Sequence, residues 1–193
     1  MANREIEVEI KVPVSKKVFE KVRKHLKKNG KFLNSSYEID KYFNAPHRNF
    51  LKKKHPTEYL RIRTKGSNGS FTYKNAYFNE SGEKTHSDEF ESKVDNPSQI
   101  EKILKVLNFD NFLTIDKKRE TYTYKDEFEI ALDKVKGLGY FVEIEATRNF
   151  GSNEQTLKKL FFLAEGMGID TSRKDKDGYA LLLLKKKQLL SKS

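Results

Sequence analysis

The chain opens on the stretch that decides its fold, EIEVEIKV, residues Glu5–Val12. Charged and apolar residues alternate through it, with Glu5, Glu7, Glu9 and Lys11 on one parity and Ile6, Val8, Ile10 and Val12 on the other. A period of two residues predicts a β-strand with one apolar and one charged face. The unusual feature is a row of three carboxylates on a single strand face.

Similar alternation recurs along the chain and is interrupted by a few helical patterns. Strands are predicted at 31–43, 59–65, 70–78, 84–94, 112–125, 127–135 and 140–150. Turns are predicted at Ser67-Asn68-Gly69 and at Gly137-Leu138-Gly139. Helical spacing of apolar residues predicts helices from Ser15 to Gly30, from Pro97 onward and over 153–167, and a lysine-rich amphipathic tail follows Asp177. Many antiparallel strands with few helices indicate an α+β fold and argue against a doubly wound parallel sheet.

Length and composition predict one domain in a reducing compartment. The 193 residues are enough for a single domain over 1–193, which ends in a basic tail at 185–193. There is no cysteine, which excludes disulfides and thiolate metal sites. The start MANREIEVEI has no apolar signal core, so we expect a cytoplasmic protein that does not contact membranes.

The charged strand faces carry both acids and bases. The acids form two Glu-x-Glu pairs, Glu7 with Glu9 and Glu143 with Glu145. The cations of matching parity are Lys11, Arg61, Arg63, Lys74, Lys117 and Arg119. If helices cover the apolar faces, these charges point into a closed or curved sheet, where they need partners. A divalent cation such as Mg²⁺ or Mn²⁺ suits the acids, and a polyanion suits the bases.

Two simpler interpretations stay open. An ordinary antiparallel sheet with one solvated face would pair its acids and bases across strands. The net charge of +11 also favours a protein that binds polyphosphate or nucleic acid without catalysis. Lysine runs such as Lys52–Lys54 and Lys185–Lys187 are interpreted as solvated faces.

A series of motifs in order resembles the CYTH superfamily, the triphosphate tunnel metalloenzymes. The motifs are EVEIK (7–11), E-x-D-x-Y-F-x-x-P (38–46), LRIR (60–63), FTYK (71–74), K-x-R (117–119) and LDKVKGLGYFVEIE (132–145). The motif-covered core spans about 5–183, nearly the whole chain, and the motifs are most similar to the class IV adenylyl cyclase branch.

The resemblance implies an eight-stranded antiparallel β-tunnel with helices outside and assigns roles by position. Glu7, Glu9, Glu143 and Glu145 would bind the metal. The tunnel cations that would bind the triphosphate are Lys11, Arg61, Arg63, Lys74, Lys117 and Arg119. Asp133 would assist the metal or the nucleophile. Further candidates from motif positions are Lys84, His86, Glu89, Glu91, Asp40, Tyr42 and Tyr179.

Two places depart from the family pattern. In KTHSDEFE the family arginine is replaced by His86, and Lys84 and Glu89 fall on opposite parity, which predicts a bulge or a shifted register there. Near the C-terminus, Asp177-Gly178-Tyr179 keeps the family tyrosine and lacks the preceding serine.

The resemblance leaves the reaction open between two alternatives. A cyclase converts ATP to cyclic AMP and pyrophosphate, whereas a triphosphatase hydrolyses tripolyphosphate or thiamine triphosphate. We favour the cyclase from the E-x-D-x-Y-F-x-x-P and GLGYFVEIE motifs. The expected partners are a triphosphate substrate and, for cyclase-like members, a second copy of the chain, with no specific nucleic acid.

Overall fold

A computed structural model describes residues 8–52, 56–78, 84–175 and 178–187. The predicted metal ligand Glu7 lies outside these residues. The elements in chain order are β1 (Glu9–Val14), α1 (Lys16–Asn29), β2 (Lys31–Asn44), β3 (Glu58–Lys65), β4 (Asn68–Phe78), β5 (Lys84–Val94), α2 (Pro97–Val106), β6 (Asp110–Tyr124), β7 (Phe128–Val135), β8 (Gly139–Ala146), α3 (Asn153–Gly166), a short 3₁₀ helix (Thr171–Arg173) and α4 (Gly178–Lys186).

The strands follow one another in the hydrogen-bonded order β1-β8-β7-β6-β2-β3-β4-β5. The pairs β1–β8, β7–β8, β6–β7, β2–β3, β3–β4 and β4–β5 are antiparallel. The predicted α+β class with eight antiparallel strands is confirmed.

The chain divides into two compact units. Unit 1 comprises Met1–Ser36 and Lys117–Gly178, and unit 2 comprises Tyr37–Asp116 and Tyr179–Ser193. The prediction of a single domain over 1–193 stays a prediction.

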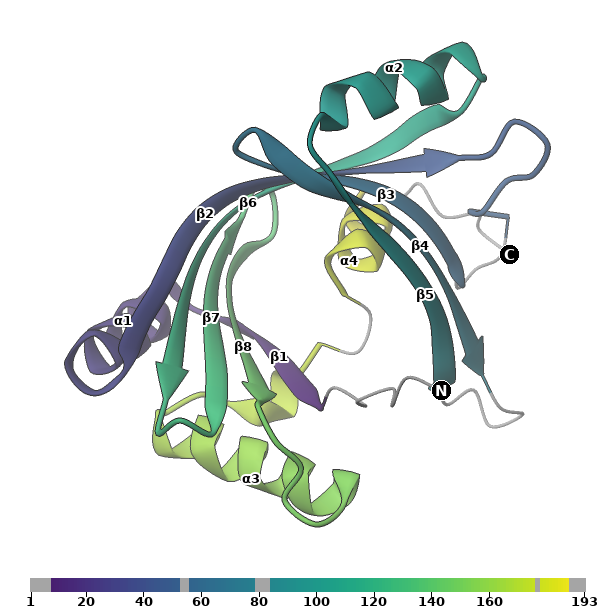
Figure 1. The fold of residues 1–193 in the computed structure, drawn as a ribbon. Helices are drawn as coiled ribbons and strands as arrows, with labels where there is room; N and C mark the ends of the chain where they lie inside the picture. Colours follow the sequence, from purple (N-terminus) through teal and green to yellow (C-terminus); the bar gives the residue numbers. More distant parts are fainter. Residues whose placement is uncertain (1–7, 53–55, 79–83, 176–177, 188–193) are drawn as a thin grey trace. The chain divides into compact units, whose positions relative to one another are not determined.

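In unit 1, helices α1 and α3 pack on the same face of strands β1, β8, β7 and β6 (Figure 1). The core between them is apolar because each strand contributes its alternate residues, as β8 does with Val142 and Ile144. From the helices come Val22, Leu26 and Leu160, all fully buried. The residues in between, including Glu143, therefore lie on the opposite face of the strands.

In unit 2, helix α2 packs on strands β3 and β4 (Figure 1). Leu60 and Ile62 of β3 and Leu104 of α2 belong to one buried cluster with Phe43 and Phe50. Arg61 and Arg63 alternate with those apolar residues and so lie on the other face of β3. Both units thus have one apolar, helix-covered face and one charged face.

Helix boundaries follow the predicted caps. The Ser15 side chain accepts a hydrogen bond from the Val18 amide at the start of α1, and Gly30 ends this helix. Asn96 caps α2 one residue before Pro97, which occupies the first turn. Among the described residues, no helix is long and apolar enough to cross a membrane.

The turn between β3 and β4 lies earlier than predicted. It is formed by Gly66 and Ser67, and Asn68 and Gly69 already belong to β4. Gly66 adopts a positive φ of 64°, which glycine allows without steric cost. Gly69 is needed for a different reason, because a Cβ at this position would lie 1.9 Å from the Arg63 carbonyl oxygen. The glycine taken as a turn residue therefore marks a close approach of two strands.

We predict that Leu26→Ala lowers the free energy of unfolding by about 2–5 kcal/mol, because it leaves a cavity under α1 in the core of unit 1. Urea denaturation followed by far-UV circular dichroism measures this change. The matched control is Leu107→Ala, whose side chain is 55% exposed and which should cost less than about 1 kcal/mol. Equal costs for the two variants would contradict the assignment of this core.

Candidate functional site

The charged face of unit 1 brings together most of the predicted residues of that half. Register places Lys11 opposite Glu143 and Glu9 opposite Glu145 across β1 and β8. It also places Arg119 of β6 opposite Asp133 of β7. We call these residues, together with Lys117, the unit 1 cluster.

Glu143 is held between two cations. Its Oε2 lies 2.8 Å from Nζ of Lys11, and its Oε1 accepts a hydrogen bond of 2.9 Å from Nη2 of Arg119. Burial alone would raise the pKa of this carboxyl. The charges of Lys11 and Arg119 outweigh that effect and lower the pKa of Glu143 to about 2. Burial likewise opposes the charge of Lys11, but Glu143 and Glu9 raise its pKa above the ordinary value.

Arg119 is fixed by a second acid. Its Nε and Nη2 donate to the two carboxylate oxygens of Asp133 at 2.8 and 2.6 Å. Asp133 is fully buried, and Lys117 nearby on β6 is only 3% exposed. A buried carboxylate that accepts both prongs of a guanidinium fork holds it in one orientation. Nη2 of Arg119 also donates a hydrogen bond to Glu143.

The acids available for a metal lie along one line across the strands. Glu145 of β8 has Glu9 of β1 on one side and Glu129 of β7 on the other. Like charges directly opposite one another in a sheet are destabilising, and a bound cation removes that cost. Among the described residues, no three acidic or histidine side chains converge closely enough to hold a metal by themselves. The donor chemistry suits Mg²⁺ or Mn²⁺, and Glu7 lies outside the described part of the chain.

Unit 2 has a second cluster built on the same principle. Nε and Nη2 of Arg63 donate to the two oxygens of Asp40, each at 2.7 Å. Burial disfavours the charged guanidinium, but the hydrogen bonds and charge of Asp40 raise the pKa of Arg63. Glu38, only 4% exposed, lies 3.6 Å from Arg63 Nε and 3.8 Å from Lys65 Nζ. Arg63 is therefore surrounded by two buried carboxylates.

Arg61 completes the unit 2 cluster beside strands β4 and β5. Its Nη2 donates to Oγ1 of Thr72 at 3.2 Å and lies 3.6 Å from Glu91. Thr72 in turn donates to Glu91 at 2.8 Å. Lys74 pairs with Glu89 at 2.7 Å, in a more exposed position. Glu89 and Glu91 thus lie on the same face as the arginines, and both contact predicted phosphate-binding cations.

The register shift predicted in β5 is present. It lies between Tyr77 and Phe78 of β4, which pair with His86 and Lys84. This pairing skips Thr85. The side chains of Lys84 and His86 lie outside the described residues, so their roles stay predictions.

The two predicted tyrosines are both buried. Tyr42 lies opposite Arg61 on β2, and its ring is within 6.4 Å of the rings of Tyr59 and Phe112. Burial and the neighbouring Asp40 raise the pKa of Tyr42, so it is a neutral phenol. Tyr179 is buried in the first turn of α4. Its part in a site stays a prediction.

Three residues of these clusters were missed in the sequence. Glu38 shares the parity of Asp40, so alternation along β2 was a usable signal. Thr72 shares the parity of Lys74, and Glu129 shares that of Asp133, but parity alone does not show which residues they meet across the strands. Their place becomes evident only from the cross-strand pairs Thr72–Glu91 and Glu129–Glu145.

The pKa of Glu143 predicts how metal-free protein responds to acid. A carboxyl whose folded pKa is lowered from 4.5 to about 2 stabilises the fold above its unfolded pKa. This contribution, roughly 3 kcal/mol, is lost as pH falls from about 5 to about 2. We predict that Glu143→Gln is less stable at neutral pH and loses less stability over that range, as measured by urea denaturation in EDTA.

The control for this acid response is Glu154→Gln on α3. Glu154 pairs with Lys158, but both side chains are more than 70% exposed, so this variant should follow the wild-type acid profile. An unchanged acid profile in Glu143→Gln would contradict the assigned pairing.

Some known proteins are similar to this chain in sequence, and some solved structures are similar to it in fold. A protein of Methanocaldococcus jannaschii, named provisionally as an adenylate cyclase, is 34% identical over 166 residues, covering 85% of this chain and 90% of that protein. A solved structure from Pyrococcus horikoshii is 28% identical with a TM-score of 0.71, covering 94% of this chain and 99% of the other.

A more distant likeness concerns the fold alone. A Hippeastrum protein, named provisionally as an adenylyl cyclase and described as having a dominant triphosphatase activity, is 18% identical with a TM-score of 0.66. The alignment covers 95% of this chain and 96% of that one. The CYTH domain pattern itself matches residues 5–179. With the fold, the ordered motifs and this match in agreement, the chain belongs to the CYTH domain family.

Proposed function

We propose that this CYTH protein is a divalent-metal-dependent enzyme that cleaves a triphosphate, and that its reaction is the conversion of ATP to cyclic AMP and pyrophosphate. The observation that carries the proposal is the set of cations held by acids: Lys11, Arg119, Arg63 and Lys74 each have a carboxylate oxygen within 2.8 Å. Phosphoryl transfer depends on such positioned cations to stabilise charge on phosphate oxygens.

In this proposal, both clusters bind phosphate oxygens through their own cations. Arg119, oriented by Asp133, and Lys117 would bind phosphate oxygens at the unit 1 cluster. Arg61 and Arg63 would do the same at the unit 2 cluster, with Asp40 and Glu38 as positioning residues. The bidentate pair with Arg119 favours a positioning role for Asp133 over that of a general base.

Glu7, Glu9, Glu143 and Glu145 are the residues proposed to hold Mg²⁺ or Mn²⁺. When bound, such an ion neutralises charge on phosphate oxygens and on the opposed carboxylates of β1 and β8. Glu143 is already paired with Lys11 and Arg119. We therefore expect Glu9 and Glu145 to contribute more to metal affinity than Glu143 does.

The alternative is a triphosphatase with the same clusters. In a cyclase the ribose 3′-hydroxyl attacks the α-phosphorus and pyrophosphate leaves, whereas in a triphosphatase water attacks the terminal phosphorus. The name of the Methanocaldococcus relative supports the first reaction. The activity described for the Hippeastrum protein supports the second, at a level of identity where only the fold is comparable. We further propose a cytoplasmic location and, for a cyclase, a homodimer.

Product analysis distinguishes the two reactions. Purified protein is incubated with Mg²⁺ or Mn²⁺ and, separately, with ATP, tripolyphosphate or thiamine triphosphate, and the products are resolved by anion exchange. We expect cyclic AMP and pyrophosphate from ATP. Orthophosphate with a diphosphate product would replace the cyclase by the triphosphatase. No turnover of any of the three would reject both.

We predict that Arg63→Ala lowers kcat/KM by about 100-fold or more, because one positioned phosphate donor is removed. The matched control is Lys102→Ala on the exposed side of α2, which should keep wild-type kinetics. Circular dichroism establishes that both variants are folded. Wild-type kinetics in Arg63→Ala would remove the unit 2 cluster from the proposal.

Metal removal is a separate prediction. Excess EDTA should abolish turnover, and added Mg²⁺ or Mn²⁺ should restore it. The net charge of +11 favours a protein that binds polyanions without catalysis. Such a protein would instead show salt-sensitive DNA binding without turnover. Turnover that is undiminished in EDTA would contradict the metal assignment.

A further inference from the structure

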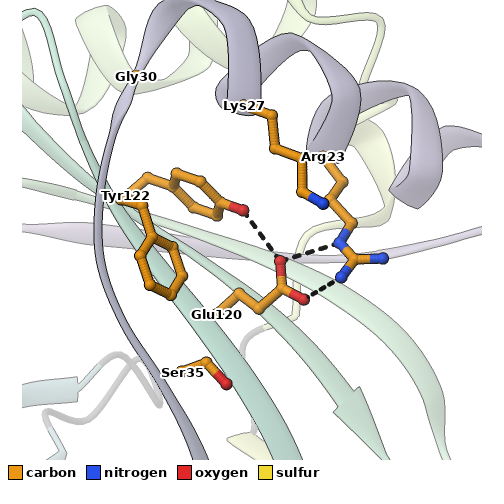
Figure 2. A pocket seen from close by; sticks show the side chains of 7 residues that line it. Arg23, Lys27, Gly30, Ser35, Glu120 and Tyr122 are labelled. Atoms are coloured by element: carbon orange, nitrogen blue, oxygen red, sulfur yellow. Dashed lines mark hydrogen bonds and ion pairs between the residues drawn. The ribbon is translucent and has the colours of Figure 1, made fainter.

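A pocket of about 420 Å³ opens in unit 1 between helix α1 and strands β2 and β6 (Figure 2). We call it the α1 pocket. Its lining includes the side chains of Arg23, Lys27, Phe32, Ser35, Glu120 and Tyr122. Its volume lies within the range of small-ligand sites.

The α1 pocket lies on the other face of β6 from the unit 1 cluster. Glu120 and Tyr122 alternate along the strand with Arg119 and Thr121, so their side chains point to the opposite side. Tyr122 belongs to the apolar core beneath α1. A ligand in this pocket would therefore not occupy the clusters assigned to triphosphate chemistry, and the inference does not rest on the proposed function.

A fixed polar group forms one wall of the pocket. Arg23 donates both prongs of its guanidinium to Glu120, the Nε bond measuring 2.9 Å, and the Tyr122 hydroxyl donates to the same carboxylate at 2.9 Å (Figure 2). Partial burial would raise the pKa of Glu120, but the bonds from Arg23 and Tyr122 lower it. Burial and Glu120 raise the pKa of Tyr122 to about 12. At neutral pH the carboxylate is charged, the phenol is neutral, and both are already engaged with each other.

The cationic side of the pocket exceeds its acidic side. Arg23 and Lys27 line it against the single carboxylate of Glu120, which leaves one positive charge. The other acid in contact is Glu20, 3.7 Å from Arg23, half exposed and outside the lining. Lys27 is exposed in the last turn of α1. Because Arg23 faces both Glu120 and Glu20, Lys27 is the lining cation through which the pocket would favour a small anion over a cation.

An aromatic surface completes the pocket. Phe32 is 53% exposed, and its ring meets that of buried Tyr122 edge-to-face at 5.4 Å. The buried tyrosine holds the phenylalanine in place, so that an exposed ring is left for stacking. Ser35 also lines the pocket and adds a hydroxyl group that can hydrogen-bond (Figure 2).

We propose that the α1 pocket binds a small aromatic anion, with its ring on Phe32 and its anionic group on Lys27. Nucleoside monophosphates and aromatic carboxylates share this chemistry. The two sources differ in the group presented to Lys27, a phosphate ester in one and a carboxylate in the other.

The experiment is a ligand-detected NMR titration of the full chain with AMP, benzoate, adenosine or inorganic phosphate. EDTA and saturating tripolyphosphate are present to occupy other anion sites. AMP or benzoate should bind, and adenosine and phosphate should bind at least tenfold more weakly because each has only half of the recognised chemistry. Tighter binding of AMP identifies a phosphate ester, and tighter binding of benzoate identifies a carboxylate.

Variants test whether the α1 pocket is the place of binding. Lys27→Ala and Phe32→Ala should each raise Kd about tenfold, and both replace exposed side chains, so the fold should persist by circular dichroism. The control is Lys17→Ala, ten residues earlier on α1, which should bind as wild type. Binding that is unchanged in both pocket variants, or absent for all four ligands, would overturn the proposal and leave Lys27 as a charge that stabilises the end of α1.

Discussion

The buried fork between Arg119 and Asp133 is the interaction on which the charged face of unit 1 depends. Asp133 is fully buried, and a carboxylate removed from water is costly unless a cation and hydrogen bonds compensate it. Arg119 supplies both and still reaches Glu143. Glu143 also forms an ion pair with Lys11 of the neighbouring strand β1. The guanidinium of Arg119 therefore links strands β6, β7 and β8 through ion pairs.

Unit 2 contains a buried ion pair of the same type. A buried aspartate, Asp40, holds the fork of Arg63 across an antiparallel pair of strands, as Asp133 holds Arg119. In both units the acid is the more deeply buried partner, so the cation is the group left facing outward from the pair. Such cations cannot reorient freely. They are therefore better suited to recognising a defined anion than the flexible lysines that supply most of the net charge of +11.

The same ion pairs would limit how the proposed metal ion and substrate bind. Glu143 gives both of its oxygens to cations, so a metal at this carboxylate competes with Lys11 and Arg119. Glu9, Glu145 and Glu129 lie opposite one another along a ladder of like charges, where a cation is favourable. A metal ion at the acids and an anion at the cations would thus offset charge at different parts of the unit 1 cluster.

The sequence by itself determined the strand faces and the helix ends. Alternation in EIEVEIKV and LRIR placed charged and apolar residues on opposite sides, and Ser15, Gly30 and Pro97 predicted helix boundaries, because these signals are local. Motif order predicted the family. Only the tertiary structure decided which acid meets which cation, since packing brings together residues far apart in the sequence, such as Arg119 with Glu143 and Arg23 with Glu120. No local pattern encodes such pairing, because it depends on strand register and on how helices pack on the sheet.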